Sequence, residues 1–306
     1  MIKKTVYLGN PYHIKLKDAQ LEFMVPEGKG IDSLMTKKVP LEDLGVLILD
    51  HPQITITHPV LQQIAAFNVA LVSCDSNHMP ASLLMPLEGH NTQQERFRAQ
   101  ISASEPLKKQ LWQQTIKCKI YNQGKILIEI GKPEEGEYLL KLSEEVKSGD
   151  TANMEGRAAA YYWKNIFSNY IAQFTRDRIG PSPNHLLNYA YAIIRATVAR
   201  ALVGSGLLPT LGIHHKNKYN AYCLADDMME PYRPYADKLI YEMLQLSMGN
   251  EIELNKEIKG QILALLGKEV MLNNTRSPMM VAIQKTSSSL AQCYEGDMRK
   301  LLYPEC

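Results

Sequence analysis

Residues 212–234 read GIHHKNKYNAYCLADDMMEPYRP, and the rest of the chain can be placed around this stretch. It carries two adjacent histidines and three carboxylates close together: His214, His215, Asp226, Asp227 and Glu230. Apolar residues are interleaved with the acids, which predicts a helix that begins near Leu224 and has an apolar and an acidic side. On such a helix Glu230 would share a face with Asp227, three residues earlier, and with Asp226, four residues earlier.

The spacing of these acids has two explanations. Carboxylates held this close repel each other unless a cation or a proton lies between them. A histidine on the loop that leads into the helix would complete a nitrogen and oxygen ligand set for a divalent metal. Alternatively the acids mark a helix start, because Asp and Glu stabilise the N-terminal turn of a helix. From this stretch alone both explanations stay open.

The N-terminal part of the chain has the pattern of a β domain. Short apolar segments in residues 1–80 alternate with turn signals such as Gly9-Asn10-Pro11, which is typical of a small β-sandwich or a curled sheet. Pro40 would confine its strand to a sheet edge, and residues 60–68 have a helical pattern. We therefore predict a β-sandwich-like domain over residues 1–85, with the Pro- and Gly-containing residues 79–90 as linker.

From about residue 91 the apolar residues recur at steps of three and four, which predicts helices. The clearest helical segments are residues 93–102, 106–123, 138–146, 153–167 and 258–266, and a less regular end is expected from Ser287 onward. Residues 91–306 are therefore predicted to form a larger all-α domain. The predicted fold class is α+β, with the β domain first.

The composition is that of an ordinary globular protein, with 306 residues of which 45% are hydrophobic and 22% charged. No apolar run approaches the length of a membrane span, and the N-terminus lacks the apolar core of a signal peptide. Five cysteines without a CxxC motif fit a reducing cytoplasm and no cysteine zinc site. The net charge of +2 does not by itself indicate a nucleic-acid-binding protein. Residues 157–200, however, carry six basic residues against one acid, which fits either a phosphate-binding face or a solvated helix face.

A second informative carboxylate is Glu155, within residues 153–167, NMEGRAAAYYWKNIF. On a helix, Glu155, Tyr162 and Ile166 lie along one otherwise apolar stripe. A carboxylate carried into the interior requires a positive partner or a metal. The alternative is a solvated residue at the helix start that complements the helix dipole. The constellation of His215 and Glu230 would offer Glu155 a shared metal, so the two features explain each other.

Three segments of the chain resemble the motifs of one family. Residues 153–159, followed by Tyr162 and Trp163, resemble the glutamate motif of the first CRISPR-associated protein, "Cas one", the integrase of spacer acquisition. Residues 212–215 resemble its histidine motif, and residues 224–234 resemble its acidic motif. The order of the motifs and the β-then-α architecture agree over essentially the whole chain. The length and the wording of the acidic motif are most similar to the type II branch.

The resemblance implies a catalytic role for the helical domain. It implies a Mg²⁺- or Mn²⁺-dependent DNA endonuclease and integrase, which joins the 3′-hydroxyl ends of a short duplex, the protospacer, to a CRISPR array by transesterification. The implied metal ligands and catalytic residues are Glu155, His215 and Glu230, since the family's histidine is the third residue after the glycine. Many relatives have aspartate where this chain has Glu230, so Asp227 is implied as a supporting residue or an alternative ligand. Two glutamates suit Mg²⁺, whereas a histidine ligand shifts the preference toward Mn²⁺.

The resemblance also implies partners. These are double-stranded DNA of the protospacer and of the CRISPR repeat, a second copy of the chain paired through the N-terminal domains, and the second CRISPR-associated protein ("Cas two") in a heterohexamer. The implied location is the cytoplasm, without a membrane.

Four basic residues near the implied ligands are candidates for contacts to DNA phosphates, although each could equally be a surface charge: Arg157, Lys216, Lys218 and Arg233. Two other functions are compatible with the residues. One is a general structure-selective, metal-dependent DNA nuclease that does not integrate. The other is a non-enzymatic helical scaffold whose acids cap helices.

Overall fold

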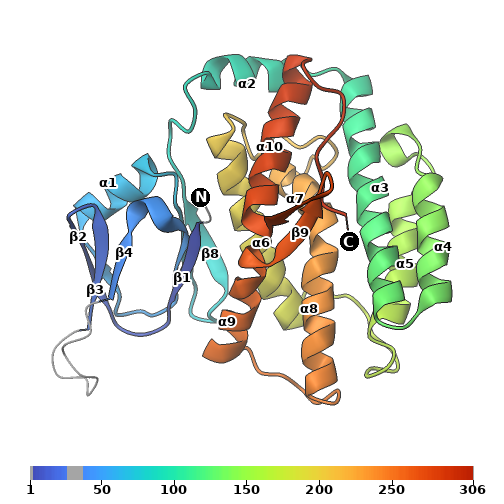
Figure 1. Ribbon diagram of the computed structural model, residues 1–306, viewed down its shortest axis with the longest axis horizontal. Helices are drawn as coiled ribbons and strands as arrows, with labels where there is room; N and C mark the ends of the chain where they lie inside the picture. Colours follow the sequence, from blue (N-terminus) through green and yellow to red (C-terminus); the bar gives the residue numbers. More distant parts are fainter. Residues whose placement is uncertain (1–2, 26–36, 306) are drawn as a thin grey trace. The chain divides into compact units, whose positions relative to one another are not determined.

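The computed structural model describes residues 3–25 and 37–305, and the chain divides into two compact units, residues 1–89 and residues 90–306 (Figure 1). The sequence pattern had placed the two domains at residues 1–85 and 91–306.

The N-terminal unit consists of short strands and one helix. Its strands are β1 (Lys4–Leu8), β2 (His13–Lys17), β3 (Gln20–Met24), β4 (Lys37–Pro40), β5 (Leu44–Leu49), β6 (Thr55–Ile56), β7 (Ala70–Cys74) and β8 (Pro80–Leu84), with the short 3-10 turn η1 (Leu41–Asp43) and helix α1 (His58–Ala66). They form two four-stranded sheets, in the orders β1-β5-β7-β8 and β4-β3-β2-β6. The first sheet is parallel from β1 to β7 because α1 supplies the crossover between β5 and β7, and β8 is antiparallel.

The core of this unit is shared by both sheets and α1. Ile14 and Leu21 from one sheet, Leu44 and Leu47 from the other, and Val60 from α1 are fully buried in one cluster. Alternating strand residues face this cluster, so the predicted two-layered β domain is confirmed.

Two prolines of the N-terminal unit lie on edge strands. Pro40 ends β4, at the edge of its sheet as predicted. Pro80 begins β8, so the prediction that residues 79–90 form a linker is wrong for residues 80–84. The proline was read as a breaker, but an edge strand tolerates a proline at its first residue because no ladder hydrogen bond is lost there.

The C-terminal unit is almost wholly helical. Its helices are α2 (Gln93–Ser102), α3 (Glu105–Glu129), α4 (Pro133–Glu144), α5 (Met154–Ile166), α6 (Asn184–Gly204), α7 (Cys223–Met229), α8 (Arg233–Leu246), α9 (Lys256–Ala264) and α10 (Met279–Glu295). Three 3-10 turns, η2 (Ser148–Asp150), η3 (Glu230–Tyr232) and η4 (Leu265–Gly267), and two strands, β9 (Glu269–Leu272) and β10 (Thr275–Pro278), complete the unit. Helices α3, α4 and α5 lie side by side (Figure 1).

The structure departs from the helical prediction in two places. Within residues 90–305, β9 and β10 form a two-stranded hairpin, which Asn273 and Asn274 close with φ of 48° and 59°. Adjacent asparagines accept this left-handed backbone, so the turn chemistry outweighs the helical surroundings. The less regular end expected from Ser287 is instead the second half of α10. There the buried Ser289 hydroxyl donates to the carbonyl of Thr286, so helix and packing accommodate the serines.

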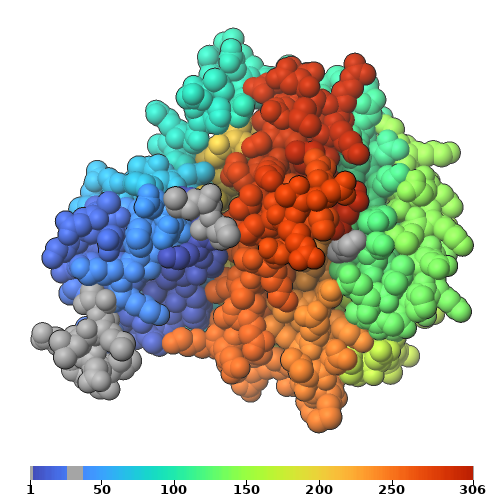
Figure 2. Space-filling view, viewed as in Figure 1, coloured from blue at the N-terminus to red at the C-terminus, as the bar shows by residue number. Residues whose placement is uncertain are grey.

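Helix α6 is the central helix of the unit. It is long and apolar enough to cross a membrane, but 78% of its most apolar window is buried by neighbouring elements, as in a core helix. Helix α10 packs along it, and little of α6 is visible behind the C-terminal segments in the space-filling view (Figure 2).

Candidate metal and catalytic centre

Glu230 is positioned by a break between two helices. Helix α7 ends at Met229, and Glu230 begins the 3-10 turn η3, in which Pro231 lacks the N–H that would continue the α-helical ladder. On the facing helix α3, Asn122 is fully buried and its side-chain amide donates to the carbonyls of Pro231 and Pro304, at 2.9 and 3.0 Å. This fixes η3 against α3 and leaves Glu230 only 2% exposed.

Glu155 is positioned by the start of α5. Asp150 accepts hydrogen bonds from the backbone N–H groups of Met154 and Glu155, at 2.8 and 2.9 Å. The N-cap residue Asn153 accepts another from the backbone N–H of Gly156. Tyr162 and Ile166 further along α5 are fully buried, so the predicted stripe exists, with the partly exposed Glu155 at its open end.

Lys119 of α3 lies between these two glutamates, and sequence reasoning missed it. Its ammonium is 2.7 Å from Oε1 of Glu155 and 2.6 Å from Oε2 of Glu230, and the residue is 7% exposed. The other carboxylate oxygen of Glu230, Oε1, is 3.1 Å from Nη1 of Arg233. The helical period could have indicated that Lys119 is buried, because it lies one turn after the buried Ile116, on the apolar face of α3.

These charges stabilise one another electrostatically. Burial acts to lower the pKa of the Lys119 ammonium, but Glu230 and Glu155 outweigh it and leave that pKa above its ordinary value. Burial likewise acts to raise the pKa of Glu230, but Arg233 and Lys119 outweigh it and leave that pKa below its ordinary value. The cluster is therefore an internal ion-pair network in which Glu230 is ionised and Lys119 is protonated.

His215 lies on the loop before α7 and is held by Asp227. Its Nδ1 is 2.5 Å from Oδ1 of the fully buried Asp227, which also accepts from the backbone N–H groups of His214 and His215. The hydrogen bond with Asp227 raises the pKa of His215, despite the opposing effect of burial. Gly212 permits this loop geometry, because a Cβ there would lie 2.4 Å from the carbonyl oxygen of His215 and 2.8 Å from Oδ2 of Asp227.

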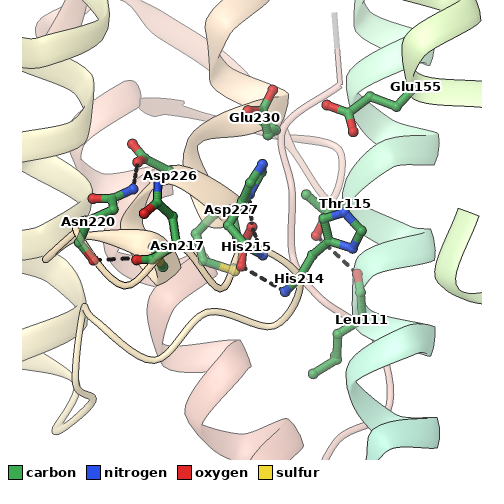
Figure 3. Close-up of polar contacts among 12 residues, drawn as sticks. Leu111, Thr115, Glu155, His214, His215, Asn217, Asn220, Asp226, Asp227 and Glu230 are labelled. Carbon is green, nitrogen blue, oxygen red and sulfur yellow. Dashed lines mark hydrogen bonds and ion pairs between the residues drawn. The ribbon is translucent and has the colours of Figure 1, made fainter. Parts of the chain in front are cut away.

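The adjacent His214 points elsewhere. Its ring stacks on Trp112 of α3, with centroids 4.1 Å apart and planes 1° apart. Figure 3 shows the two imidazoles diverging, with the ring of His215 below Glu230 and the carboxylate of Glu155 turned toward Glu230. Glu230 and Glu155 lie near enough to act electrostatically on His215. The three predicted ligands thus converge from α5, the histidine loop and η3.

The three acids of the α7 motif pair with different residues. Asp226 accepts from the side-chain amide of Asn220 at 2.7 Å, Asp227 pairs with His215, and Glu230 pairs with Lys119. Helix α7 ends before Glu230, which begins η3, and the common face of the three acids stays a prediction.

The four basic candidates are placed differently from one another. Arg233 pairs with Glu230 and lies over the ring of Tyr191, whereas the side chain of Arg157 is exposed and contacts the sulfur of Met154. Lys216 and Lys218 are exposed and line a cavity of about 420 Å³ whose wall includes His215. Lys216 is 3.6 Å from Glu105, and the ammonium of Lys218 lies over the ring of Tyr219.

Comparison with known proteins identifies the family. The family described as CRISPR associated protein Cas1 matches residues 6–275 of the chain. The chain belongs to the Cas1 family. It is similar to the CRISPR-associated endonuclease Cas1 of Neisseria meningitidis serogroup C, with 36% identity over 87% of this chain and 86% of the relative. A Cas1 endonuclease of Francisella tularensis subsp. novicida is 23% identical over 85% of this chain and 88% of its own length.

Solved structures support the same fold. A casposase bound to its integration product superposes with a TM-score of 0.80, at 19% identity over 98% of this chain and 92% of the casposase. A Cas1 protein of Thermotoga maritima gives a TM-score of 0.73, at 17% identity over 96% of this chain and 98% of that one. The Cas1 fold is therefore confirmed, whereas membership of the type II branch stays a prediction.

The donors present fit a divalent cation chemically. Oε2 of Glu230 is buried and, among the described residues, accepts no hydrogen bond of acceptable geometry, although Lys119 forms a close ion pair with it. With Nδ1 of His215 directed at Asp227, Nε2 is the nitrogen available to a metal. In the part of the chain that the structure describes, however, no three His, Cys, Asp or Glu side chains are close enough together to hold a metal ion. Lys119 occupies the space between the two carboxylates instead.

Proposed function

We propose that this Cas1 protein is a Mg²⁺- or Mn²⁺-dependent DNA endonuclease and integrase of CRISPR spacer acquisition. It joins the 3′-hydroxyl ends of a short protospacer duplex to a CRISPR array in the cytoplasm. The observation that carries the proposal is the convergence of Glu155, His215 and Glu230, from three separate segments, on one charged centre. The similarity to a casposase bound to its integration product supports the joining reaction.

In this function Glu155, His215 and Glu230 would hold the cation. A bound divalent cation polarises a phosphoryl oxygen and stabilises the attacking and leaving oxygens of a phosphoryl transfer. Asp227 holds His215 in the tautomer with Nε2 free, because Nδ1–H donates to the buried carboxylate. Asn122 and the start of α5 keep Glu230 and Glu155 in place.

The joining reaction is a balanced exchange. The oxygen of a protospacer 3′-hydroxyl forms a bond to a phosphorus of the array, and the bond from that phosphorus to its own 3′ oxygen breaks. The proton of the attacking hydroxyl is taken up by the leaving oxygen through solvent. One phosphodiester bond replaces another, so no nucleotide cofactor is needed. Exposed Arg157, Lys216 and Lys218 would contact DNA phosphates around the centre.

The proposed partners are DNA, a second copy of the chain and Cas2. Solved complexes titled Cas6-RT-Cas1–Cas2 contain a chain with this fold, with a TM-score of 0.75 over 99% of this chain and 36% of that one. We propose a homodimer that assembles with Cas2 into a heterohexamer.

A strand-joining assay tests the proposal. The protein is incubated with a short duplex, a supercoiled plasmid that carries a CRISPR array, Mn²⁺ and Cas2, and covalently joined products are measured. Glu155→Gln and His215→Ala are expected to abolish joining. Glu144→Gln is the matched control, because Glu144 also pairs with a lysine but is exposed. Cutting without joining would favour a structure-selective nuclease, and undiminished joining by Glu155→Gln would refute the metal centre.

A further inference from the structure

Lys119 is an unusual neighbour for a metal site. It is a buried cation of α3, and its ammonium is within 2.7 Å of one carboxylate oxygen of Glu155 and within 2.6 Å of one of Glu230. Both carboxylates are proposed metal ligands, and Lys119 bridges one oxygen of each. An ammonium group in this position replaces part of the charge that a metal would supply.

The two cations beside Glu230 differ in their partners. Arg233 is held twice, by Oε1 of Glu230 and by the ring of Tyr191, whose centroid is 5.0 Å from the guanidinium carbon. Lys119 has no such aromatic contact among the described residues, and its ammonium pairs with both Glu155 and Glu230. Lys119 is therefore the cation that joins the two proposed ligands.

We propose that Lys119 is a positioning residue, an internal counter-ion that holds Glu155 and Glu230 together in the metal-free protein and competes with the divalent cation for them. The inference rests on the proposed function of the centre. Two consequences follow. Without Lys119 the metal-free protein carries a buried carboxylate, Glu230, that keeps the ion pair with Arg233 and loses the one with Lys119, so it is less stable. The same change removes a competing positive charge, so the metal binds more tightly.

The test compares Lys119→Met with Lys117→Met. Lys117 lies on the same helix and also pairs with a glutamate, Glu144, at 2.6 Å, but its side chain is 46% exposed. Mn²⁺ alone is titrated into each protein and followed by calorimetry and by the electron paramagnetic resonance of free Mn²⁺. Melting temperatures are measured in chelator and in saturating Mn²⁺.

We expect Lys119→Met to lower the dissociation constant for Mn²⁺ on the order of tenfold, the scale on which neighbours of metal ligands act. Its melting temperature should fall in chelator, and Mn²⁺ should raise it more than in the wild type. Lys117→Met should match the wild type in both measurements. If Lys119→Met does not fold in chelator, Lys119→Gln, which retains a hydrogen-bond donor, is measured in the same way.

The outcomes separate this inference from the proposed function. Unchanged or weaker Mn²⁺ binding by both Lys119 variants, with normal binding by the wild type, would overturn the role of Lys119 and leave the metal centre intact. If the wild type shows no Mn²⁺ binding that depends on Glu155, so that Glu155→Gln changes nothing, the metal centre and this inference are both overturned.

Discussion

The adjacent histidines provide the sharpest test of the site, because their rings have different contacts in the structure. His215→Ala removes a proposed metal ligand and the 2.5 Å contact with Asp227. His214→Ala removes a ring that stacks on Trp112 and meets the ring of His215 edge-on, and it keeps the backbone N–H that donates to Asp227. Metal-dependent joining should therefore distinguish them clearly.

The magnitudes follow from these contacts. Losing a ligand should reduce Mn²⁺-dependent joining by about 100-fold or more. Asp227 keeps two backbone donors in His215→Ala, so the stability loss should stay near the value of one charge-assisted hydrogen bond, about 1.5–3 kcal/mol. His214→Ala should cost about 0.5–1.5 kcal/mol for the lost stacking. Its joining rate should fall by less than about tenfold, as for a residue that only supports a ligand.

The assay is single-turnover joining of a labelled duplex with Mn²⁺, and folding of both variants is checked by circular dichroism and denaturant unfolding. Loss of joining in His214→Ala together with normal joining in His215→Ala would show that the ligand is His214, contrary to the stacking of His214 on Trp112. Full activity in both variants would contradict a histidine ligand altogether.

Two further predictions concern the supports of the site. Burial raises the pKa of Asp237 to about 7, although hydrogen bonds from Tyr191 and Tyr162 act to lower it. Protonated Asp237 therefore stabilises the folded state at low pH. This stabilisation is lost as the pH rises toward 7. Between about pH 5 and pH 8 the unfolding free energy of the wild type should therefore fall by roughly 2–3 kcal/mol more than that of Asp237→Asn. Denaturant titrations at several pH values measure this difference, and parallel pH profiles of the two proteins would contradict the prediction. Asn122→Ala strands two buried carbonyl groups and should cost about 2–4 kcal/mol in denaturant unfolding, whereas a loss below about 0.5 kcal/mol would disprove its role in fixing η3.

Much of the fold could be predicted because its signals are local. The change from period two to period 3.6 gave the order of the two parts of the chain, and the first helical segment, residues 93–102, has the same bounds as α2. Likewise, the stripe on α5 depends only on helical geometry. The predictions failed where one residue type serves two structures. Pro80 opens an edge strand, and the serines from Ser287 onward lie within a helix.

The sequence analysis proposed the acids and the histidine of the site, and it missed the charge balance around them. The residues of the 212–234 stretch are close together in the sequence, and a shared cation was one of two explanations of their spacing. The cation that pairs with each acid is determined by contacts between segments that are distant in the sequence. The spacing of residues within a motif does not encode such contacts. In the structure Glu230 meets Lys119 from α3, although the predicted partner was a metal shared with His215.

These contacts make α3 the support of the site, although the helix carries none of the three family motifs. Along α3, Trp112 stacks on His214, Lys119 joins Glu155 to Glu230, and Asn122 fixes the turn that carries Glu230. The three residues reach the histidine loop, the start of α5 and η3 in turn. A rigid helix that contacts all three ligand-bearing segments sets the distances between them, whether or not a metal is bound. Substitutions on this face of α3 should therefore change metal affinity, and those on its exposed face, such as Lys117→Met, should not.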